Sequence, residues 1–570
     1  MHIFMGNIEQ LKLLTKEFSK AEDIYKLITI KSMTDNIDIK HKYYMYNVPE
    51  EYINSVQILT YNNIIAEIAR ENSYINIVMD NKNCNQYLYA ILGCLYDRLI
   101  DLIHNKELEY CISVLSMLEI NRYYAKGITL WSRKQEFETN NDNLFDAIIK
   151  VLNADGYEEG AENYLYFDNL FAKDKNALET IFPQIYKKID LDNAIQNKLK
   201  ISDLNIGLLL NLAIAILYIF NIIDEFKRGD LKNEKIEVDS NGNFLFCCKN
   251  STDKKIEYYN YILKSGDSYV SRYIDKMNNV MENILGFSEA NINVIIDSLN
   301  DFLGLCGNEY IVEEKETLIK LLASKSKMNT KNINKMINYL IYQLPQTPYD
   351  GKTHFEDKIT RRCILNINGI LLVPLGLLKT GIINIYMDVT NNQVSDPILK
   401  KSLNEVYALI NSEFEEIVFD KCKRDIQYKF IQKNVQQKDI KIGEVCIELP
   451  GEIDVLLLYE DVLFVFECKN IATRTTYDMI NSLRIDLISD YKNTSFQKKL
   501  KFKINRLKDN IEVVEKFVGT QNTIRDVTGC IVTKGFYFKP IVAKNSVYDV
   551  ISWSELTDWV NRYIAKEDMK

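Results

Sequence analysis

Four charged residues interrupt two apolar runs in the segment 451–470 (GEIDVLLLYEDVLFVFECKN): Glu452, Asp454, Glu467 and Lys469. Nearly continuous apolar runs of this length predict β-strands that are covered on both faces, at the centre of a sheet. Charged groups in such strands are costly unless they are paired or bind a metal. We therefore take these four residues as candidates for chemistry.

The turn between the two runs decides whether the candidates meet. If positions 460–461 form a two-residue turn, Asp454 lies opposite Glu467 and Glu452 lies opposite Lys469, with Cβ atoms about 5 Å apart on one face. A four-residue loop shifts the pairs but keeps all four on that face, whereas a loop of odd length would separate them. Two neighbouring carboxylates repel each other unless a cation lies between them. Hard oxygen ligands favour Mg²⁺ or Mn²⁺.

The sequence Gly-Glu-Ile-Asp454-Val, followed after 12 residues by Glu467-Cys-Lys469, resembles the motif of the PD-(D/E)xK nuclease superfamily, which has the restriction-endonuclease-like fold. The resemblance covers about residues 402–563, and it departs from the family pattern in having isoleucine in place of the proline. It implies a Mg²⁺- or Mn²⁺-dependent endonuclease that hydrolyses phosphodiester bonds. Asp454, Glu467 and the backbone carbonyl of Cys468 would hold the metal, which activates water. Lys469 would orient or deprotonate the attacking water.

The family also places an acidic residue on the helix before the sheet, which is expected here at residues 403–423. At 100° per residue, Glu416 points away from the apolar stripe of this helix, while Glu413 and Glu415 flank the stripe. The family's glutamate commonly follows an aromatic residue, which favours Glu415, after Phe414, as a further catalytic residue and metal ligand. The alternative is a solvated helix glutamate.

A basic segment follows the candidate strands. Residues 491–508 contain seven basic residues and no acidic one. If the segment is helical, Lys498, Lys501 and Lys508 lie near one face, which would suit contacts with nucleic-acid phosphates. The alternative is a solvated basic helix. Gln497 resembles the glutamine that some relatives place on this helix, so it is a further candidate for nucleic-acid contact.

The elements around these residues predict a multidomain protein. The chain has only 21 glycines and 8 prolines in 570 residues, which favours long helices. We expect a large, mainly α-helical region at 1–345, a connector at 346–400 containing a β-hairpin that turns at 368–369, and a nuclease domain at 401–570. In that domain the patterning predicts helix, three strands, helix, strand and helix, which makes a C-terminal α/β restriction-endonuclease-like domain with a mixed central sheet. A further Asn-Gly pair, at 241–242, predicts another hairpin.

Composition restricts the environment. The apolar run Ile206–Ile223 is at the short limit for a membrane span of about 20 residues, and we expect a buried helix and no membrane. The 11 cysteines form no CxxC and there are only four histidines, so we do not expect a zinc site. We expect a reducing, cytoplasmic compartment. Residues 401–570 carry 26 basic and 26 acidic side chains, so the net charge of −9 lies in 1–400, a poor non-specific DNA binder.

The sequence therefore predicts a cytoplasmic, metal-dependent nuclease. DNA is favoured over RNA by the frequency of substrates in the superfamily, and a role in antiviral defence against foreign DNA is an analogy. The helical region is expected to serve sensing, homo-oligomerisation or binding of a protein partner. Two alternatives stay open. One is a catalytically silent nuclease-like module for binding or assembly, which the intact Asp454, Glu467 and Lys469 disfavour. The other is an RNA-cleaving toxin.

Overall fold

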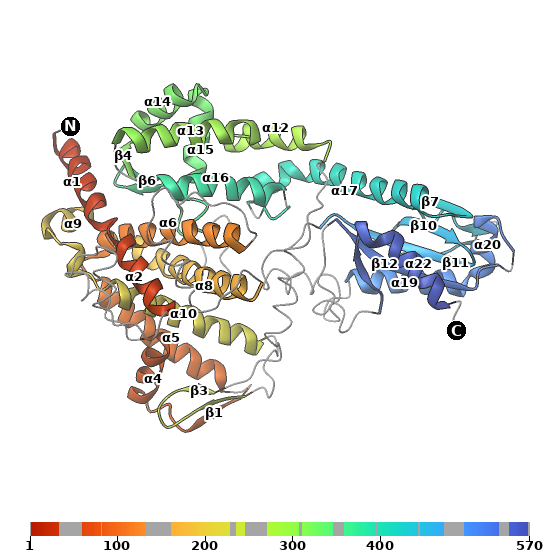
Figure 1. Ribbon diagram of the computed structural model, residues 1–570, viewed down its shortest axis with the longest axis horizontal. Coiled ribbons are helices and arrows are strands. Elements are labelled where there is room, and N and C mark those ends of the chain that lie inside the picture. The colour runs from red at the N-terminus through yellow and green to blue at the C-terminus, as the bar shows by residue number, and fades with distance from the viewer. Residues whose placement is uncertain are drawn as a thin grey trace. The chain divides into compact units, whose positions relative to one another are not determined.

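The computed structural model describes residues 2–33, 60–80, 83–132, 161–227, 235–245, 271–306, 310–345, 358–390, 392–394, 396–442, 445–471, 495–521, 523–534 and 547–567 (Figure 1). The contacts of the chain define two compact units. The first unit is Met1–Ser251 with Asn278–Leu399, and the second is Thr252–Met277 with Lys400–Lys570.

The first unit is mainly helical, as the sequence predicted. Its helices are α1 (His2–Phe18), α2 (Ala21–Met33), α4 (Tyr61–Glu71), α5 (Cys84–Ile103), α6 (Glu107–Ser132), α8 (Ala161–Tyr186), α9 (Leu191–Asn197), η2 (Ile201–Asp203), α10 (Ile206–Lys227), α13 (Glu289–Cys306), α14 (Lys315–Ser326), α15 (Thr330–Leu340) and α16 (Leu375–Thr390). Two helices continue from one unit into the other, α12 (Ile274–Leu285) and α17 (Pro397–Asp425). Side-chain caps start several of these helices; at α4, for example, the side chain of Thr60 accepts from the amide of Asn63.

Helix α10 contains the apolar run whose length is at the short limit for a membrane span. Among the described residues, Ile206–Ile223 is the one stretch long and apolar enough to cross a membrane, and 78% of it is buried inside the protein. It packs against helices α4, α5 and α8. A helix that is apolar all round suits such a place in a helical core, as the sequence analysis expected.

Two small antiparallel sheets complete the first unit. Strands β2 (Ile236–Val238) and β3 (Phe244–Leu245) form the hairpin that the Asn-Gly pair at 241–242 predicted, and β1 (Ile77–Met79) pairs with β2. Strands β5 (Leu365–Ile367) and β6 (Ile370–Pro374) form the hairpin predicted at 368–369. Both residues of its turn have positive φ, 50° at Asn368 and 88° at Gly369, the conformation that favours Asn-Gly there.

The hairpin at 365–374 is not part of a separate connector. Strand β6 also pairs along its length with β4 (Tyr310–Glu314), so the three strands form one sheet of the first unit. All five residues of β6 are buried, as expected of a central strand whose two faces are both covered. The segment 346–400, as far as it is described, therefore belongs to the helical unit up to Leu399.

The second unit is built on a five-stranded sheet in the order β13-β12-β11-β10-β7. Its strands are β7 (Phe430–Val435), β10 (Ile453–Tyr459), β11 (Val462–Lys469), β12 (Asp526–Thr533) and β13 (Val550–Ser552). β7, β10 and β11 are antiparallel, while β11, β12 and β13 are parallel, so the sheet is mixed as expected. The short β13 and the small pair β8 (Lys441–Ile442) and β9 (Val445–Cys446) are additions to the predicted order.

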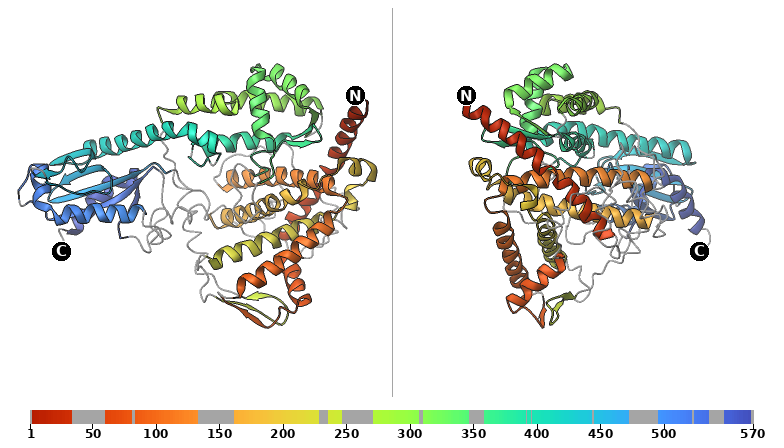
Figure 2. Two further views of the ribbon diagram at one scale, coloured as in Figure 1. Left: turned by 180° about the vertical axis from the view of Figure 1, so that it is seen from behind. Right: turned by 60° about the vertical axis from the view of Figure 1, so that its left-hand side comes forward.

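Helices cover both faces of this sheet (Figures 1 and 2). Strands β10 and β11 are central and have buried apolar side chains on both sides. One face packs on α19 (Phe496–Asp509) and α20 (Ile511–Val518), through residues such as Leu500, Ile504 and Val514. The other face packs on α17, the turn η5 (Trp553–Glu555) and α22 (Leu556–Glu567), where Phe414 and Trp559 are buried. The second unit is thus a three-layer α/β domain.

Candidate functional site

The β10–β11 hairpin brings the two candidate carboxylates together. Its turn contains two residues, 460–461, as the sequence predicted, because the two flanking residues pair with each other. The last paired residues at the other end are Val455 and Phe466, which are the chain neighbours of Asp454 and Glu467. In this register Asp454 and Glu467 are the next opposed residues, on one face of the sheet.

Lys469 lies beside both carboxylates. Its Nζ is 2.7 Å from Oε1 of Glu467 and 3.7 Å from Oδ2 of Asp454. The same Oδ2 accepts a hydrogen bond of 2.6 Å from the amide of Cys468. Asp454 and Glu467 are each only 5% exposed. The predicted trio is therefore one buried cluster of two carboxylates and one ammonium.

A second lysine, which the sequence analysis did not select, completes this cluster. Lys503 of α19 donates to Oε2 of Glu467 and to the backbone carbonyl of Glu452, both at 2.5 Å. It is 2% exposed and sits on the buried face of α19 between Leu500 and Leu507. A lysine at an apolar position of an amphipathic helix was the available signal, because such a lysine needs a buried partner. The side chain of Glu452, in contrast, is exposed.

The charges of the cluster separate the pKa values of its two carboxyls. Burial, helped by the charge of Glu467, raises the pKa of Asp454 to about 6. Burial acts on Glu467 in the same direction, but the charges of Lys469 and Lys503 outweigh it and lower the pKa of Glu467. The pKa of Lys469 is raised, since the charges of the two carboxylates outweigh its own burial. Glu467 is thus the firmly ionised member, and strongly shifted neighbours of this kind are typical of functional sites.

Glu415 lies within electrostatic range of the cluster, although α17 covers the opposite face of the sheet from α19. Burial and then the charge of Asp454 raise the pKa of Glu415 to about 7. The charge of Lys469 also acts on it, in the opposite direction. Glu415 therefore remains the acidic residue of α17 that is predicted to serve the site.

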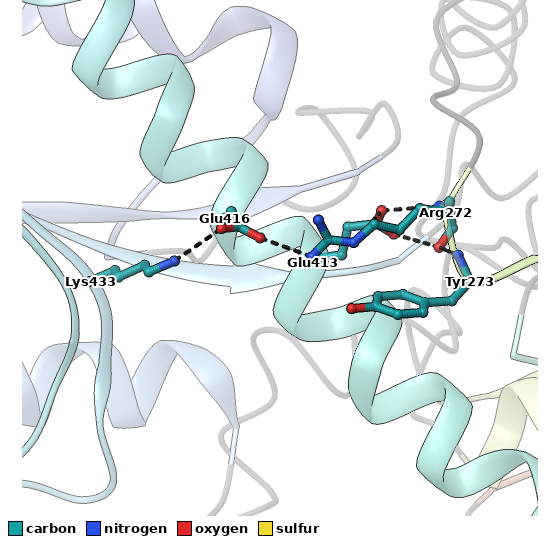
Figure 3. A network of polar contacts seen from close by, with 6 residues as sticks. Arg272, Tyr273, Glu413, Glu416 and Lys433 are labelled. Atoms are coloured by element: carbon teal, nitrogen blue, oxygen red, sulfur yellow. Dashed lines mark hydrogen bonds and ion pairs between the residues drawn. The ribbon is translucent and has the colours of Figure 1, made fainter.

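The neighbouring glutamates of α17 are engaged elsewhere, in the network shown in Figure 3. Glu413 is buried and accepts hydrogen bonds from the hydroxyl of Ser271 and, at 3.0 Å, from the amide of Arg272. Glu416 binds the guanidinium of Arg272 at 3.0 Å and Nζ of Lys433, on β7, at 3.3 Å. Through these contacts Glu413 and Glu416 attach the segment before α12 to α17. No local sequence pattern predicts this attachment.

Among the residues that the structure describes, no three His, Cys, Asp or Glu side chains form a metal-binding group. Asp454 and Glu467 nevertheless offer two carboxylates on one patch, and Mg²⁺ commonly keeps several waters and binds one or two carboxylates. By donor chemistry these residues fit Mg²⁺ or Mn²⁺. Binding would require one of the lysines to release its oxygen of Glu467. The Cys468 carbonyl and Glu415 stay predicted ligands.

From residue 496 on, the basic segment forms the predicted helix, α19, and residues 491–494 lie outside the described part of the chain. The helix is preceded by Ser495, whose side chain accepts from the amide of Lys498. Lys501 and Lys508 are exposed, and Lys508 pairs with Asp526 at 2.9 Å. Lys498 is half-buried. These three lysines stay candidates for phosphate contacts, although Lys508 is already paired with the first residue of β12.

Gln497 is buried and holds the segment before β13. Its Nε2 donates to the carbonyl of Tyr548 at 2.6 Å, and its Oε1 accepts from the amide of Tyr548 at 3.0 Å. Both ends of the side-chain amide are therefore used inside the protein. These contacts support a structural role for Gln497. They do not support the predicted contact of Gln497 with nucleic acid.

Comparison with known proteins gives no relative. No family model matches this chain, no curated protein matches it and no solved structure matches it.

Proposed function

We propose that the second unit is a Mg²⁺- or Mn²⁺-dependent nuclease of the PD-(D/E)xK type with a restriction-endonuclease-like fold. The observation that carries the proposal is the buried cluster in which Lys469 Nζ lies 2.7 Å from Glu467 and 3.7 Å from Asp454. Two carboxylates and a lysine at the end of a central hairpin agree with the motif resemblance. The mixed sheet between two helical layers agrees with the proposed fold.

The residues take distinct parts in the proposed hydrolysis. Asp454 and Glu467, with the Cys468 carbonyl and Glu415, would hold the metal. When bound, the metal supplies Lewis-acid neutralisation of the phosphate and lowers the pKa of water. Lys469 orients the attacking water and stabilises the charge that builds on the phosphate, and its compact ammonium can approach more closely than a guanidinium. Burial of the cluster strengthens each of these electrostatic interactions.

The proposal extends to substrate and setting. The substrate is a nucleic acid, DNA in preference to RNA, held through phosphates by the exposed lysines of α19. Each of the seven cysteines whose side chains the structure describes is a free thiol, which suits a reducing, cytoplasmic compartment. The first unit would recognise a signal, a second copy or a protein partner, in a role such as defence against foreign DNA.

One observation favours a second candidate, a nuclease-like module that binds without cleaving. Both oxygens of Glu467 accept from ammonium groups, so the charges of the cluster are balanced inside the protein. Incubation of the full chain with Mg²⁺ or Mn²⁺ and with plasmid, linear duplex, single strands and RNA separates the candidates. Cleavage that disappears in Asp454→Asn and Lys469→Ala supports the nuclease. Binding without cleavage of any substrate supports the silent module, and cleavage of RNA alone supports a toxin.

A further inference from the structure

Glu467 has an ammonium group on each of its carboxylate oxygens. Lys469 approaches Oε1 at 2.7 Å and Lys503 approaches Oε2 at 2.5 Å. The two lysines differ in freedom. The Lys503 side chain is 3% exposed and also donates to the Glu452 carbonyl, whereas the Lys469 side chain is 20% exposed. Lys503 is therefore the fixed partner of Glu467, and Lys469 is the one that can move toward solvent.

The second lysine changes what a divalent cation meets at this site. Asp454 and Glu467 contribute two negative charges, and Lys469 and Lys503 contribute two positive ones, so the formal charge of the cluster is zero. A fixed ammonium within a few ångströms of a divalent cation opposes its binding by well over tenfold, even at an effective dielectric constant of about 20. A nucleic-acid phosphate at the site would restore the missing negative charge.

We propose that Lys503 couples metal binding to nucleic-acid binding: it holds Glu467 in place and balances its charge, so that the metal binds tightly only together with a phosphate of the substrate. Lys503 is thus a positioning residue that acts through Glu467. The inference rests on the proposed nuclease function and deepens it. The metal-free protein is stable because Lys503 takes the place of a cation, and the complete site forms only on the substrate.

Calorimetric titration of the full chain with Mn²⁺ tests the inference, with and without saturating thymidine 3′,5′-bisphosphate, which contains no phosphodiester to cleave. For the wild type we expect at least tenfold tighter Mn²⁺ binding when the nucleotide is present. Lys503→Met should bind Mn²⁺ at least tenfold more tightly than the wild type without nucleotide, and the effect of the nucleotide should shrink. Lys503→Gln, which keeps a donor for the Glu452 carbonyl, should do the same if the Met variant does not fold. Lys499→Met, on the same helix, is the matched control and should behave as the wild type.

Two results overturn different statements. If Asp454→Ala abolishes Mn²⁺ binding but Lys503→Gln binds Mn²⁺ no more tightly than the wild type, the role of Lys503 is wrong and the metal site stands. If the wild type binds no Mn²⁺ with or without nucleotide, or if Asp454→Ala leaves its affinity unchanged, the proposed function fails and the inference fails with it.

Discussion

The backbone amide of Arg272 donates to Oε1 of Glu413 at 3.0 Å, across 141 residues of sequence (Figure 3). The hydroxyl of Ser271 donates to the other oxygen of the same carboxylate. Glu413 is buried, and Glu415, two residues further along α17, is the acidic residue predicted to serve the candidate site. A segment that lies more than a hundred residues before α17 in the sequence therefore helps to fix the helix beside the candidate site.

Replacing Glu413 with Ala should destabilise the second unit. The change leaves the Ser271 hydroxyl and the Arg272 amide without their acceptor in a buried place, which costs about 1–3 kcal/mol. Denaturant unfolding followed by tryptophan fluorescence measures the loss. Of the three tryptophans of the chain, Trp553 and Trp559 belong to the second unit and report on its unfolding, while Trp131 belongs to the first. Glu416→Ala is the control, because its ion pairs are exposed and worth at most about 1 kcal/mol. Equal losses in the two variants would contradict a buried role for Glu413.

Asp454→Asn should abolish cleavage and stabilise the metal-free protein. Because the folded pKa of Asp454 is raised to about 6 from 3.8, the folded state binds the proton more tightly than the unfolded state. The ionised carboxylate therefore destabilises the fold, by an amount that grows as the pH rises from about 4 and is complete above about pH 6. The variant should gain about 1–3 kcal/mol in the free energy of unfolding at pH 7.5 and little near pH 4. Full cleavage activity in this variant would remove Asp454 from the site.

Lys469→Ala should lose cleavage and keep metal binding, since an ammonium group is not a ligand. Mn²⁺ titration of the full chain should give an affinity at least equal to that of the wild type, because a positive charge 2.7 Å from a carboxylate oxygen is removed. Glu467→Ala is the comparison and should bind Mn²⁺ at least tenfold more weakly. The assigned roles are contradicted if the two variants lose affinity equally. Lys469→Arg should also fail to cleave, because its wider group displaces the water.

The lysines of α19 should contribute salt-dependent binding. Replacing Lys498, Lys501 and Lys508 together with Gln should weaken binding of duplex DNA irrespective of sequence, because phosphate contacts carry no base information. The slope of log K against log salt should become shallower by about 0.9 for each lost contact, or by nearly 3 in total. Lys508 should contribute least of the three, since Asp526 already neutralises part of its charge. Affinities are measured by fluorescence anisotropy over a range of salt concentrations.

A triple variant with the same change of net charge is the control for that experiment. Lys429, Lys438 and Lys441 are exposed and lie outside α19. Changing these three to Gln should leave the slope within one unit of the wild type. An equal effect of both triple variants would mean that the nucleic acid is attracted by the overall charge of the protein and not by a particular surface of α19.

The sequence by itself determined the central hairpin and the pairing of its charged residues. Side chains alternate along a strand and a two-residue turn fixes the register, so Asp454, Glu467 and Lys469 were placed on one patch from local rules alone. The Asn-Gly turn at 368–369 was equally local, because both positions need a positive φ. These features depend on residues that are close together along the chain.

Only the tertiary structure decided which distant residues join them. Lys503 reaches Glu467 because α19 packs on the sheet, and Arg272 reaches Glu413 because its segment folds back onto α17. Likewise, β4 joins the hairpin at 365–374 and makes the expected connector part of the first unit. A sequence pattern shows that a buried charge or a strand edge requires a partner, but the partner's identity depends on packing between elements far apart in the chain.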